Sequence, residues 1–325
     1  MFTGYNDMHK PLLTIGIPTY NRAKYLDRCL NSILIQFDGL EKDIELIIAN
    51  NASTDHTKEI VNHYSQRMKI DYYEREVNLG PDSTSSLCFE KASGKYVWVL
   101  GDDEYLIEGS LKQILGLLQN KDYGDVYLHC IPFHHEEEVD ETPIKKVQTI
   151  TYNEPVDFIK IIHYYATFIS GNIINKSILQ NDTSYQKYMH TNIVQIGWTI
   201  KAIFLAQENL YVETPLFAAK QNNSGGYQFV TTFAKNYNFI LKSLVKEGHD
   251  KRIIDITNIN LIKSYFPANI IKLLYYENRF DVEKHFSVLF NSFWKYKSFW
   301  TELFPIYTKY WLKKISGKKI VKYQN

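Results

Sequence analysis

The chain has 325 residues, of which 45% are hydrophobic and 22% charged, and its formal net charge is +1. These values are ordinary for a folded protein, and they exclude a disordered chain and a strongly basic one of the kind that binds nucleic acid. Three cysteines without metal-type spacing argue against a disulfide framework and a cysteine-rich zinc site. Aromatic residues, at 15%, are unusually frequent, and composition alone does not explain them.

Targeting signals are not apparent in the sequence. The N-terminal segment has no long apolar core, so we expect no signal peptide. No apolar run approaches the roughly 20 residues that cross a bilayer. We therefore expect a cytoplasmic protein.

Short apolar runs alternate with amphipathic stretches in the first hundred residues, an order that predicts a mostly parallel, doubly wound sheet flanked by helices. Pro18 is expected to stop the first strand. Ser53 or Asp55 is expected to cap the second helix, which ends near residue 67. The expected strands are 12–17, 44–49, 70–73 and 96–100, and the other two helices are 22–36 and 82–92.

The pattern loosens after residue 125. Asn222–Gly226 is the best linker candidate, and from residue 229 to the end the sequence predicts helices only. We therefore expect an α/β domain at 1–224 and a helical region at 225–325. The expected elements between them are a strand at 125–131, a loop at 133–141, a helix at 153–165 capped by Asn153, an apolar segment at 169–174 and a helix at 190–206.

Four polar clusters follow the four predicted parallel strands. The carboxyl ends of such strands share one edge of a sheet, where ligands gather. Any one cluster could be an ordinary turn, but four at one edge predict a binding site. The clusters are 18–22 (PTYNR), 50–55 (NNASTD), 78–80 (NLG) and 101–104 (GDDE).

The last cluster holds three consecutive acids, Asp102, Asp103 and Glu104. Adjacent carboxylates repel each other unless a cation lies between them. Hard oxygen ligands suit Mg²⁺ or Mn²⁺, which commonly bridge to substrate phosphates. The alternative is a solvated turn that caps a helix over 106–118.

Two earlier clusters carry groups that suit a nucleotide. The amides, hydroxyls and carboxylate of residues 50–55 could bind a base or ribose. Tyr20 could stack on the base and Arg22 could approach a phosphate. The alternatives are a helix cap, packing at a helix start and a solvated charge.

Taken together, the four motifs resemble family 2 glycosyltransferases of the GT-A (Rossmann-like) fold. The matching runs are IGIPTYNR, ELIIANNASTD, NLGP and ASGKYVWVLGDDE, between Ile15 and Glu104. The LGDDE ending is most similar to the abequosyltransferase-like enzymes of bacterial surface polysaccharides. The resemblance is strong over the first third, weak to about Ala219 and absent from the last hundred residues.

The resemblance implies a hexosyltransferase-type enzyme that moves a sugar from a nucleotide-diphosphate sugar to a hydroxyl of a glycan or lipid-linked glycan, with inversion. It implies a metal site for Mn²⁺ or Mg²⁺ at Asp103, supported by Asp102 and Glu104. Gly101 stands where the family's metal motif has its first acid. The implied nucleotide-binding residues are Pro18, Thr19, Tyr20, Asn21, Arg22, Asn50, Asp55, Asn78, Gly80 and Asp102.

The general base is unassigned, because residues 192–198 lack the carboxylate pair that inverting members carry there. The candidates are His163, His190 and His134, with the other acids and histidines of 134–141, and the alternative for each histidine is a structural or solvated side chain. Gly171, Asn172 and Trp198 are candidates for the acceptor side, although Trp198 could equally be core.

Residues 291–325 differ from the rest of the chain in charge. They carry eight lysines and one acid, for +7, whereas the remaining residues sum to −6. They also contain three of the five tryptophans. Basic residues mixed with aromatics suggest binding to an anionic membrane surface, here its inner face. The alternative is that the aromatics pack on the catalytic domain or on a second subunit of a homo-oligomer.

Two other functions remain for comparison. A nucleotidyltransferase would need a glycine-rich phosphate loop after the first strand, which residues 18–22 lack. A catalytically degenerate scaffold subunit of a polysaccharide assembly complex is favoured by Gly101 and the missing base, and opposed by the intact acids at 102–104.

Overall fold

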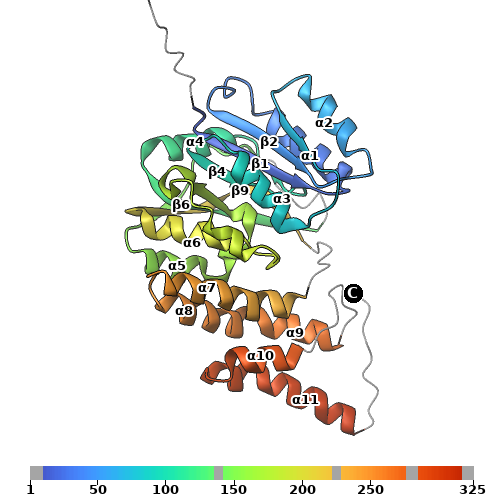
Figure 1. The fold of residues 1–325 in the computed structure, drawn as a ribbon, viewed down its shortest axis with the longest axis vertical. Helices are drawn as coiled ribbons and strands as arrows, with labels where there is room; N and C mark the ends of the chain where they lie inside the picture. The colour runs from blue at the N-terminus through green and yellow to red at the C-terminus, as the bar shows by residue number, and fades with distance from the viewer. Residues whose placement is uncertain (1–9, 135–141, 222–227, 276–284, 317–325) are drawn as a thin grey trace, which may run out of the picture.

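The computed structural model describes residues 10–134, 142–221, 228–275 and 285–316. Its strands form a mixed sheet that lies above a stack of helices (Figure 1). Along the sheet the strands lie in the order β3 (Asp71–Glu74), β2 (Ile44–Asn50), β1 (Leu13–Thr19), β4 (Tyr96–Val99), β8 (Asn172–Asn175), β6 (Tyr123–Phe133), β9 (Glu208–Lys220) and β5 (Tyr105–Leu106), with β7 (Thr149–Tyr152) paired to β9.

The first half matches the predicted alternation of strands and helices. Strands β1 to β4 are mutually parallel where they pair. Each predicted element is found within a few residues of its expected bounds. They are β1 (Leu13–Thr19), α1 (Ala23–Leu34), β2 (Ile44–Asn50), α2 (Thr57–Ser65), β3 (Asp71–Glu74), α3 (Pro81–Lys91) and β4 (Tyr96–Val99).

Strand β1 does not stop at Pro18, as the sequence suggested, but continues to Thr19. Pairing with β4 ends at Gly16, whose carbonyl accepts the Leu100 N–H. The Thr19 carbonyl faces β2, where it accepts the Asn51 N–H. Hydrogen bonds alternate sides along a strand, so the missing N–H of Pro18 faces beyond the end of β4 and removes no ladder bond.

The middle of the chain contains elements that the sequence did not suggest. Strands β7 (Thr149–Tyr152) and β9 (Glu208–Lys220) were not predicted, and β5 (Tyr105–Leu106) pairs with β9 where a helix start was the alternative. The loop expected at 133–141 lies largely outside the described residues. The remaining elements are α4 (Ser110–Asn120), β6 (Tyr123–Phe133), α5 (Pro155–Ile162), β8 (Asn172–Asn175) and α6 (Ile196–Leu205).

Two predicted helices are shorter than expected. Helix α5 has Glu154 rather than Asn153 at its N-cap position, without a side-chain cap hydrogen bond. It ends at Ile162, because His163 has a φ of 25°. Helix α6 begins at Ile196 rather than near residue 190. His190 and Asn192 have φ values of 67° and 64°, which a right-handed helix does not accommodate.

The two faces of the sheet are covered by different helices. One buried cluster joins β1, β2 and β4 to α1, α2 and α4. A larger cluster on the other face joins the sheet to α3, α5 and α6, and continues into the C-terminal helices. The sheet edge that carries the polar clusters is thereby fixed between two apolar layers.

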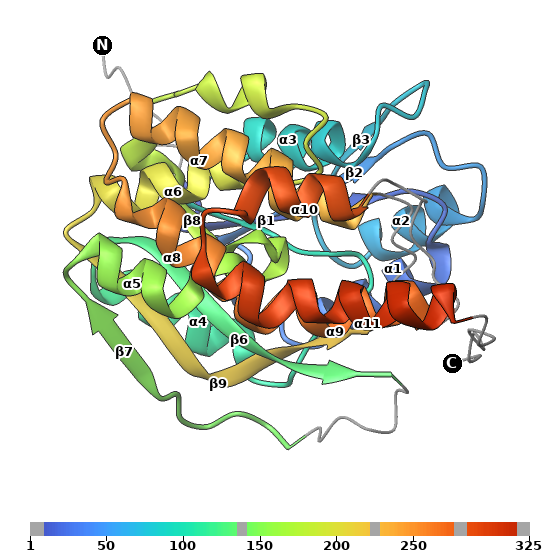
Figure 2. The same ribbon diagram turned by 90° about the horizontal axis from the view of Figure 1, so that it is seen from below.

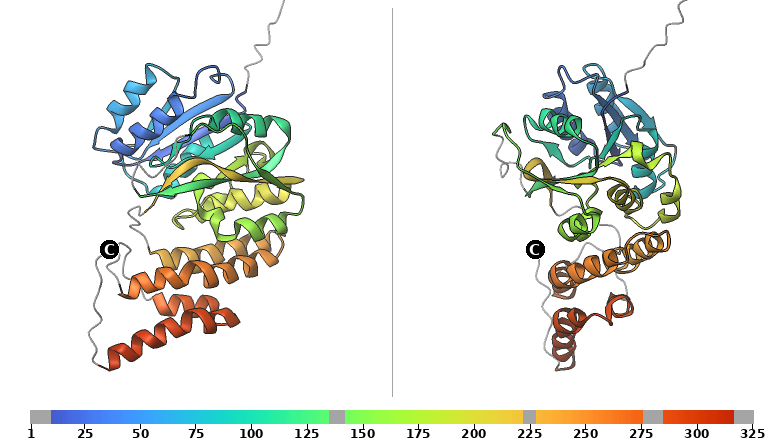
Figure 3. Two further views of the ribbon diagram at one scale, coloured as in Figure 1. Left: turned by 180° about the vertical axis from the view of Figure 1, so that it is seen from behind. Right: turned by 90° about the vertical axis from the view of Figure 1, so that its left-hand side faces the viewer.

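The described residues beyond 228 are all helical apart from their connections, as predicted. Figures 1 and 3 show these helices stacked beneath the sheet, with the last pair outermost, and Figure 2 looks onto that pair from below. The helices are α7 (Tyr237–Lys246), α8 (Arg252–Asn260), α9 (Phe266–Tyr275), α10 (His285–Phe293) and α11 (Phe304–Ile315).

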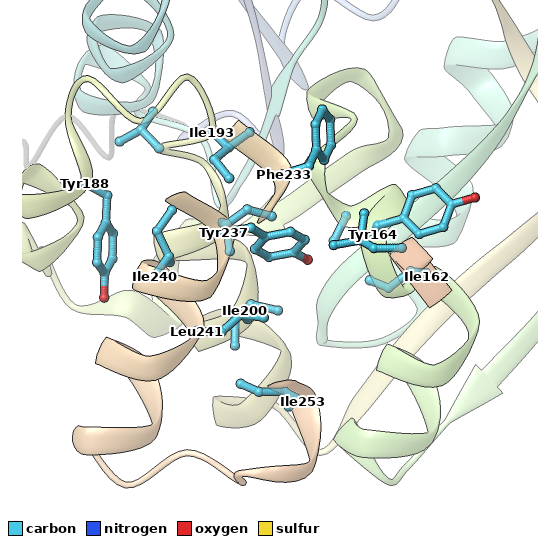
Figure 4. Close-up of a cluster of buried hydrophobic side chains, with 14 of the residues drawn as sticks. Ile162, Tyr164, Tyr188, Ile193, Ile200, Phe233, Tyr237, Ile240, Leu241 and Ile253 are labelled. Atoms are coloured by element: carbon cyan, nitrogen blue, oxygen red, sulfur yellow. The ribbon is translucent and has the colours of Figure 1, made fainter. Parts of the chain in front are cut away.

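Apolar packing ties the C-terminal helices to the rest of the fold. Tyr237 and Leu241 on α7 are buried against Ile200 of α6 and Ile253 of α8 (Figure 4). The same cluster contains Phe293 of α10. The Asn222–Gly226 linker lies outside the described residues, and the boundary between 1–224 and 225–325 stays a prediction.

Candidate functional site

The acids after β4 lie against the cluster that follows β1. The Thr19 hydroxyl donates to Asp102 Oδ2 at 2.7 Å. A single nitrogen of Arg22, Nη1, donates to Asp102 Oδ1 at 3.0 Å and to Asp103 Oδ2 at 2.9 Å. Two of the polar clusters predicted at one sheet edge are therefore joined directly, through charge-assisted hydrogen bonds.

All three acids are buried, at 3%, 8% and 3% exposure for Asp102, Asp103 and Glu104. Burial raises the pKa of Asp102 to about 6, against the opposing charge of Arg22. Burial, assisted by the negative charge of Asp103, raises the pKa of Glu104 well above its ordinary value. Ser170 donates to Glu104 Oε1 at 3.3 Å, and Oε2 is buried without a partner among the described residues.

The oxygens around Gly101 bear on whether a metal fits. A Cβ at Gly101 would lie 3.1 Å from Asp103 Oδ1 and 3.3 Å from Glu104 Oε1, so these two oxygens gather beside the backbone of residue 101. Asp103 Oδ1 accepts no hydrogen bond from the described residues, whereas Asp102 has both oxygens engaged. Mg²⁺ is usually held by one or two carboxylates plus substrate phosphates, so the arrangement fits Asp103 as the main protein ligand.

A complete metal cage is absent from the described ranges: no group of three His, Cys, Asp or Glu side chains could hold an ion there. Asp102 is tied to Thr19 and Arg22, and Glu104 to Ser170. Any ion at this edge would therefore depend on oxygens supplied by a ligand.

Asn21 and Asp55 hold the loop after β2 against the loop after β1. Asn21, at a φ of 52°, accepts the Thr54 N–H at 2.7 Å and donates its own N–H to Ser53. Asp55 accepts the N–H of Ala23 at 2.9 Å. Burial opposes ionisation of Asp55, but hydrogen bonds from Thr57 and Ala23 outweigh it and lower its pKa. Asp55 therefore joins the start of α1 to the loop after β2.

Asn50 is 1% exposed, and both ends of its amide are engaged. Its Nδ2 donates to the Tyr72 hydroxyl at 2.8 Å, and its Oδ1 accepts the Ser53 N–H at 2.9 Å. In this arrangement Asn50 shapes the loop, whereas Tyr20 is 43% exposed at the same edge and its ring is accessible for stacking.

Asn51, which the sequence reasoning did not single out from its cluster, connects the third polar cluster to this edge. It donates to Asn78 Oδ1 at 2.7 Å and accepts the Leu79 N–H at 3.0 Å. Gly80 has a φ of 84° with open space where a Cβ would lie, so backbone can approach a ligand there. Asn51 could have been found from its place beside Asn50, whereas Tyr72 and Ser170 act across strands and give no local signal.

The residues predicted for the acceptor side lie in the interior. Asn172 and Trp198 are 4% and 3% exposed, and Gly171 is buried against the Tyr127 ring. Trp198 stacks on Phe89 with ring centroids 4.2 Å apart. This packing matches the core alternative for Trp198.

The three histidine candidates lie in different surroundings. Burial lowers the pKa of His163 to about 4, and its Nδ1 accepts the Tyr164 N–H. His134 is exposed at the end of β6. His190 is exposed in the turn before α6, which the buried Asp82 anchors by accepting the Asn192 and Val194 N–H groups at 2.8 and 3.2 Å. Asp82 was not predicted, although it lies two residues after Gly80.

The outermost helix pair exposes aromatic and basic side chains. Trp294 and Trp300 are 48% and 43% exposed, whereas Phe299, Leu303 and Tyr307 are buried. Lysines 295, 297, 309, 313 and 314 are also exposed. Within the described ranges, none of the helices has the length and apolarity needed to cross a bilayer.

Sequence comparisons place these features in a family. The family model for glycosyl transferase family 2 matches residues 14–180. Over 121 residues the chain is 40% identical to abequosyltransferase RfbV of Salmonella typhimurium, covering 36% of this chain and 35% of that protein. Over 123 residues it is 31% identical to the GalNAc(5)-diNAcBac-PP-undecaprenol beta-1,3-glucosyltransferase of Campylobacter jejuni, covering 37% and 38%. The matched segments span little more than a third of these relatives.

Solved structures share the fold over most of the chain. The S. aureus TarS 1–349 complex with UDP-GlcNAc superposes with a TM-score of 0.65 at 17% identity, over 86% of this chain and 80% of that one. Mannosyltransferase PcManGT from Pyrobaculum calidifontis, in complex with GDP-Man and Mn²⁺, gives 0.56 at 14% identity, over 95% and 88%. The predicted GT-A fold is confirmed. Because the family model spans more than half of the sequence, the chain belongs to glycosyl transferase family 2.

Proposed function

We propose that this protein transfers a sugar from a nucleotide-diphosphate sugar to a hydroxyl of a glycan or lipid-linked glycan. The observation that carries the proposal is the joined edge of Thr19, Arg22, Asp102 and Asp103, next to the loops of Asn21 and Asn78. The family and the names of the relatives support it. Those names also favour a role in bacterial surface polysaccharide or lipopolysaccharide synthesis.

In the proposed reaction the acceptor oxygen attacks the anomeric carbon as the bond to the nucleoside diphosphate breaks, with inversion. The exposed Tyr20 ring would stack on the base, and Arg22 would face the phosphates. Asp103 would hold Mn²⁺ or Mg²⁺, which when bound neutralises charge on the leaving diphosphate. Thr19 and Arg22 keep the two aspartates in place by the hydrogen bonds that they donate.

The acceptor hydroxyl must lose a proton as it attacks, and we propose His190 as the base. Its side chain is exposed in a turn fixed by Asp82. Asp82 follows Gly80 by two residues, which connects this turn to the sheet edge that carries the polar clusters. A pKa near 4 leaves His163 a weak base at neutral pH, and one ring nitrogen is already engaged.

Association with the inner face of the membrane is a separate part of the proposal. Amphipathic aromatic side chains beside exposed lysines favour the interface of an anionic bilayer. Trp294 and Trp300 lie together, since the Trp300 indole N–H donates to the Trp294 carbonyl at 2.8 Å. A lipid-linked acceptor would reach the enzyme at such a surface.

Liposome flotation tests this part. With vesicles of phosphatidylcholine and phosphatidylglycerol at low salt, we expect binding that the double variant Trp294→Ser/Trp300→Ser loses. Tyr165→Ser, which removes an equally exposed aromatic elsewhere, serves as the control. No binding by the wild type would contradict the membrane proposal, and a change of oligomeric state in the double variant would instead indicate a second copy of the chain.

A scaffold subunit without catalysis is the second candidate function, favoured by Gly101 and by the lack of a carboxylate before α6. A panel of UDP-, CDP-, GDP- and dTDP-sugars with Mn²⁺ separates the two. We expect one donor to raise the melting temperature and to be hydrolysed slowly, since a ligand that binds the folded state stabilises it. Binding without any turnover would favour the scaffold, and no binding at all would contradict both.

A further inference from the structure

Arg22 makes an unusual contact for a residue expected to meet a ligand. Its Nη1 bridges the two aspartates at 3.0 and 2.9 Å, and both carboxylates are nearly buried, with side-chain exposures of 5% and 6%. Adjacent buried carboxylates repel each other, and the guanidinium supplies the compensating charge. The aspartate pair therefore has a cation supplied by the chain itself.

The guanidinium has unused donors that point to a second partner. Among the described residues, Nη1 alone donates hydrogen bonds, which leaves Nε and Nη2 available. The Arg22 side chain is 28% exposed, unlike the acids it contacts. A planar guanidinium binds phosphate through two parallel hydrogen bonds, so these donors suit a diphosphate.

We propose that Arg22 is a resident counter-cation that keeps a divalent ion from binding tightly to the aspartates until a nucleoside diphosphate arrives. Like charges repel, so Arg22 weakens binding of an ion at Asp103 in the nucleotide-free protein. A diphosphate offers oxygens to both cations, and its negative charge offsets the repulsion between Arg22 and the ion. The diphosphate part rests on the proposed function, whereas competition between Arg22 and the ion does not.

Titration of nucleotide-free protein with Mn²⁺, followed by calorimetry and by the EPR signal of free Mn²⁺, tests the competition. We expect Arg22→Gln to bind Mn²⁺ about tenfold more tightly than wild type, because the pair loses its compensating charge. Lys24→Gln, the same charge change two residues away on α1, is the matched control and should bind like wild type. The double variant Arg22→Gln/Asp103→Asn should no longer bind Mn²⁺ more tightly than wild type.

A second titration measures binding of UDP, CDP, GDP and dTDP in EDTA. Here the Arg22 variant should change its affinity in the opposite direction. Whichever nucleotide wild type binds, Arg22→Gln should bind about tenfold more weakly. Tighter Mn²⁺ binding with weaker nucleotide binding separates the proposal from misfolding, which would weaken the binding of both ligands. If Arg22→Gln does not fold, Arg22→Met keeps the apolar stem and answers the same question.

The outcomes are distinguishable. Mn²⁺ binding that is unchanged or weaker in a folded Arg22 variant overturns the proposal. Tighter Mn²⁺ binding together with no binding of any of the four nucleotides retains the competition and contradicts the proposed donor site. Arg22→Lys, which keeps the charge, should bind Mn²⁺ like wild type, and a tenfold gain in that variant would show that charge is not the cause.

Discussion

The sheet edge that carries the four polar clusters and the C-terminal helices are each held together by different means. At the edge, hydrogen bonds among acids, amides and one arginine join four loops. Below the sheet, a single apolar cluster runs from α6 through α7 and α8 to α10 and beyond. Polar changes at the edge should therefore affect chemistry more than stability, and apolar changes below should do the reverse.

The largest effect is expected for Asp103→Ala. Loss of the carboxylate that we propose as the main metal ligand should reduce transfer by about a thousandfold or more. The fold should remain intact, because Asp102 still pairs with Thr19 and Arg22. Activity with the best donor and the melting temperature would be measured together, with the exposed Asp122→Ala as control. Full activity in Asp103→Ala, or wild-type activity in EDTA, would refute the metal assignment.

Leu241→Ala tests the other region. Leu241 is fully buried on α7, so its truncation should lower the free energy of unfolding by about 3 kcal/mol. Denaturant unfolding measures this, and Leu205→Ala, at a side chain 59% exposed, should cost far less. A folded Leu241→Ala protein should bind nucleotide normally. Loss of nucleotide binding at denaturant concentrations below the unfolding transition would show that the C-terminal helices and the polar sheet edge are coupled.

His190→Gln is expected to lower the transfer rate about a hundredfold while leaving donor binding and donor hydrolysis nearly unchanged, because the residue would act on the acceptor. His163→Gln is the comparison. An equal loss in both variants, or a loss confined to His163→Gln, would remove His190 as the base.

Asp125→Asn should have the smallest effect, and one that depends on pH. Asp125 on β6 is fully buried, both its oxygens lack a partner in the described ranges, and burial raises its pKa well above the ordinary value. Between the unfolded pKa of about 4 and the higher folded pKa, the native state binds more protons, so wild-type stability falls as pH rises.

Asparagine removes that dependence. The free energy of unfolding of Asp125→Asn should therefore rise relative to that of wild type by about 1 kcal/mol or more between pH 5 and pH 8, as measured by urea unfolding. Asp122→Asn, at an exposed neighbouring position, should show no such trend relative to wild type. A wild-type stability that stays constant relative to Asp125→Asn over this range would contradict a protonated Asp125.

The sequence predicted that the polar clusters meet at one sheet edge, because their residues follow their strands directly and need only the strand order to come together. Thr19, Arg22 and Asp102 are an example, since β1 and β4 are adjacent. The acceptor side was less predictable. Trp198 turned inward onto Phe89, and Asp82 reached residues 192–194 over more than a hundred residues of chain. Strands β7 and β9 escaped prediction because pairing, rather than local pattern, defines them.

Gly101 also limits how an acid could be added to this edge. A side chain there would place its Cβ 3.1 Å from Asp103 Oδ1 and 3.2 Å from Glu104 Cγ. A Gly101→Asp substitution would therefore require the Asp103 or Glu104 side chain to move by a few tenths of an ångström. Such a variant would not simply add a carboxylate to the proposed metal site, because it would also displace the side chains already there.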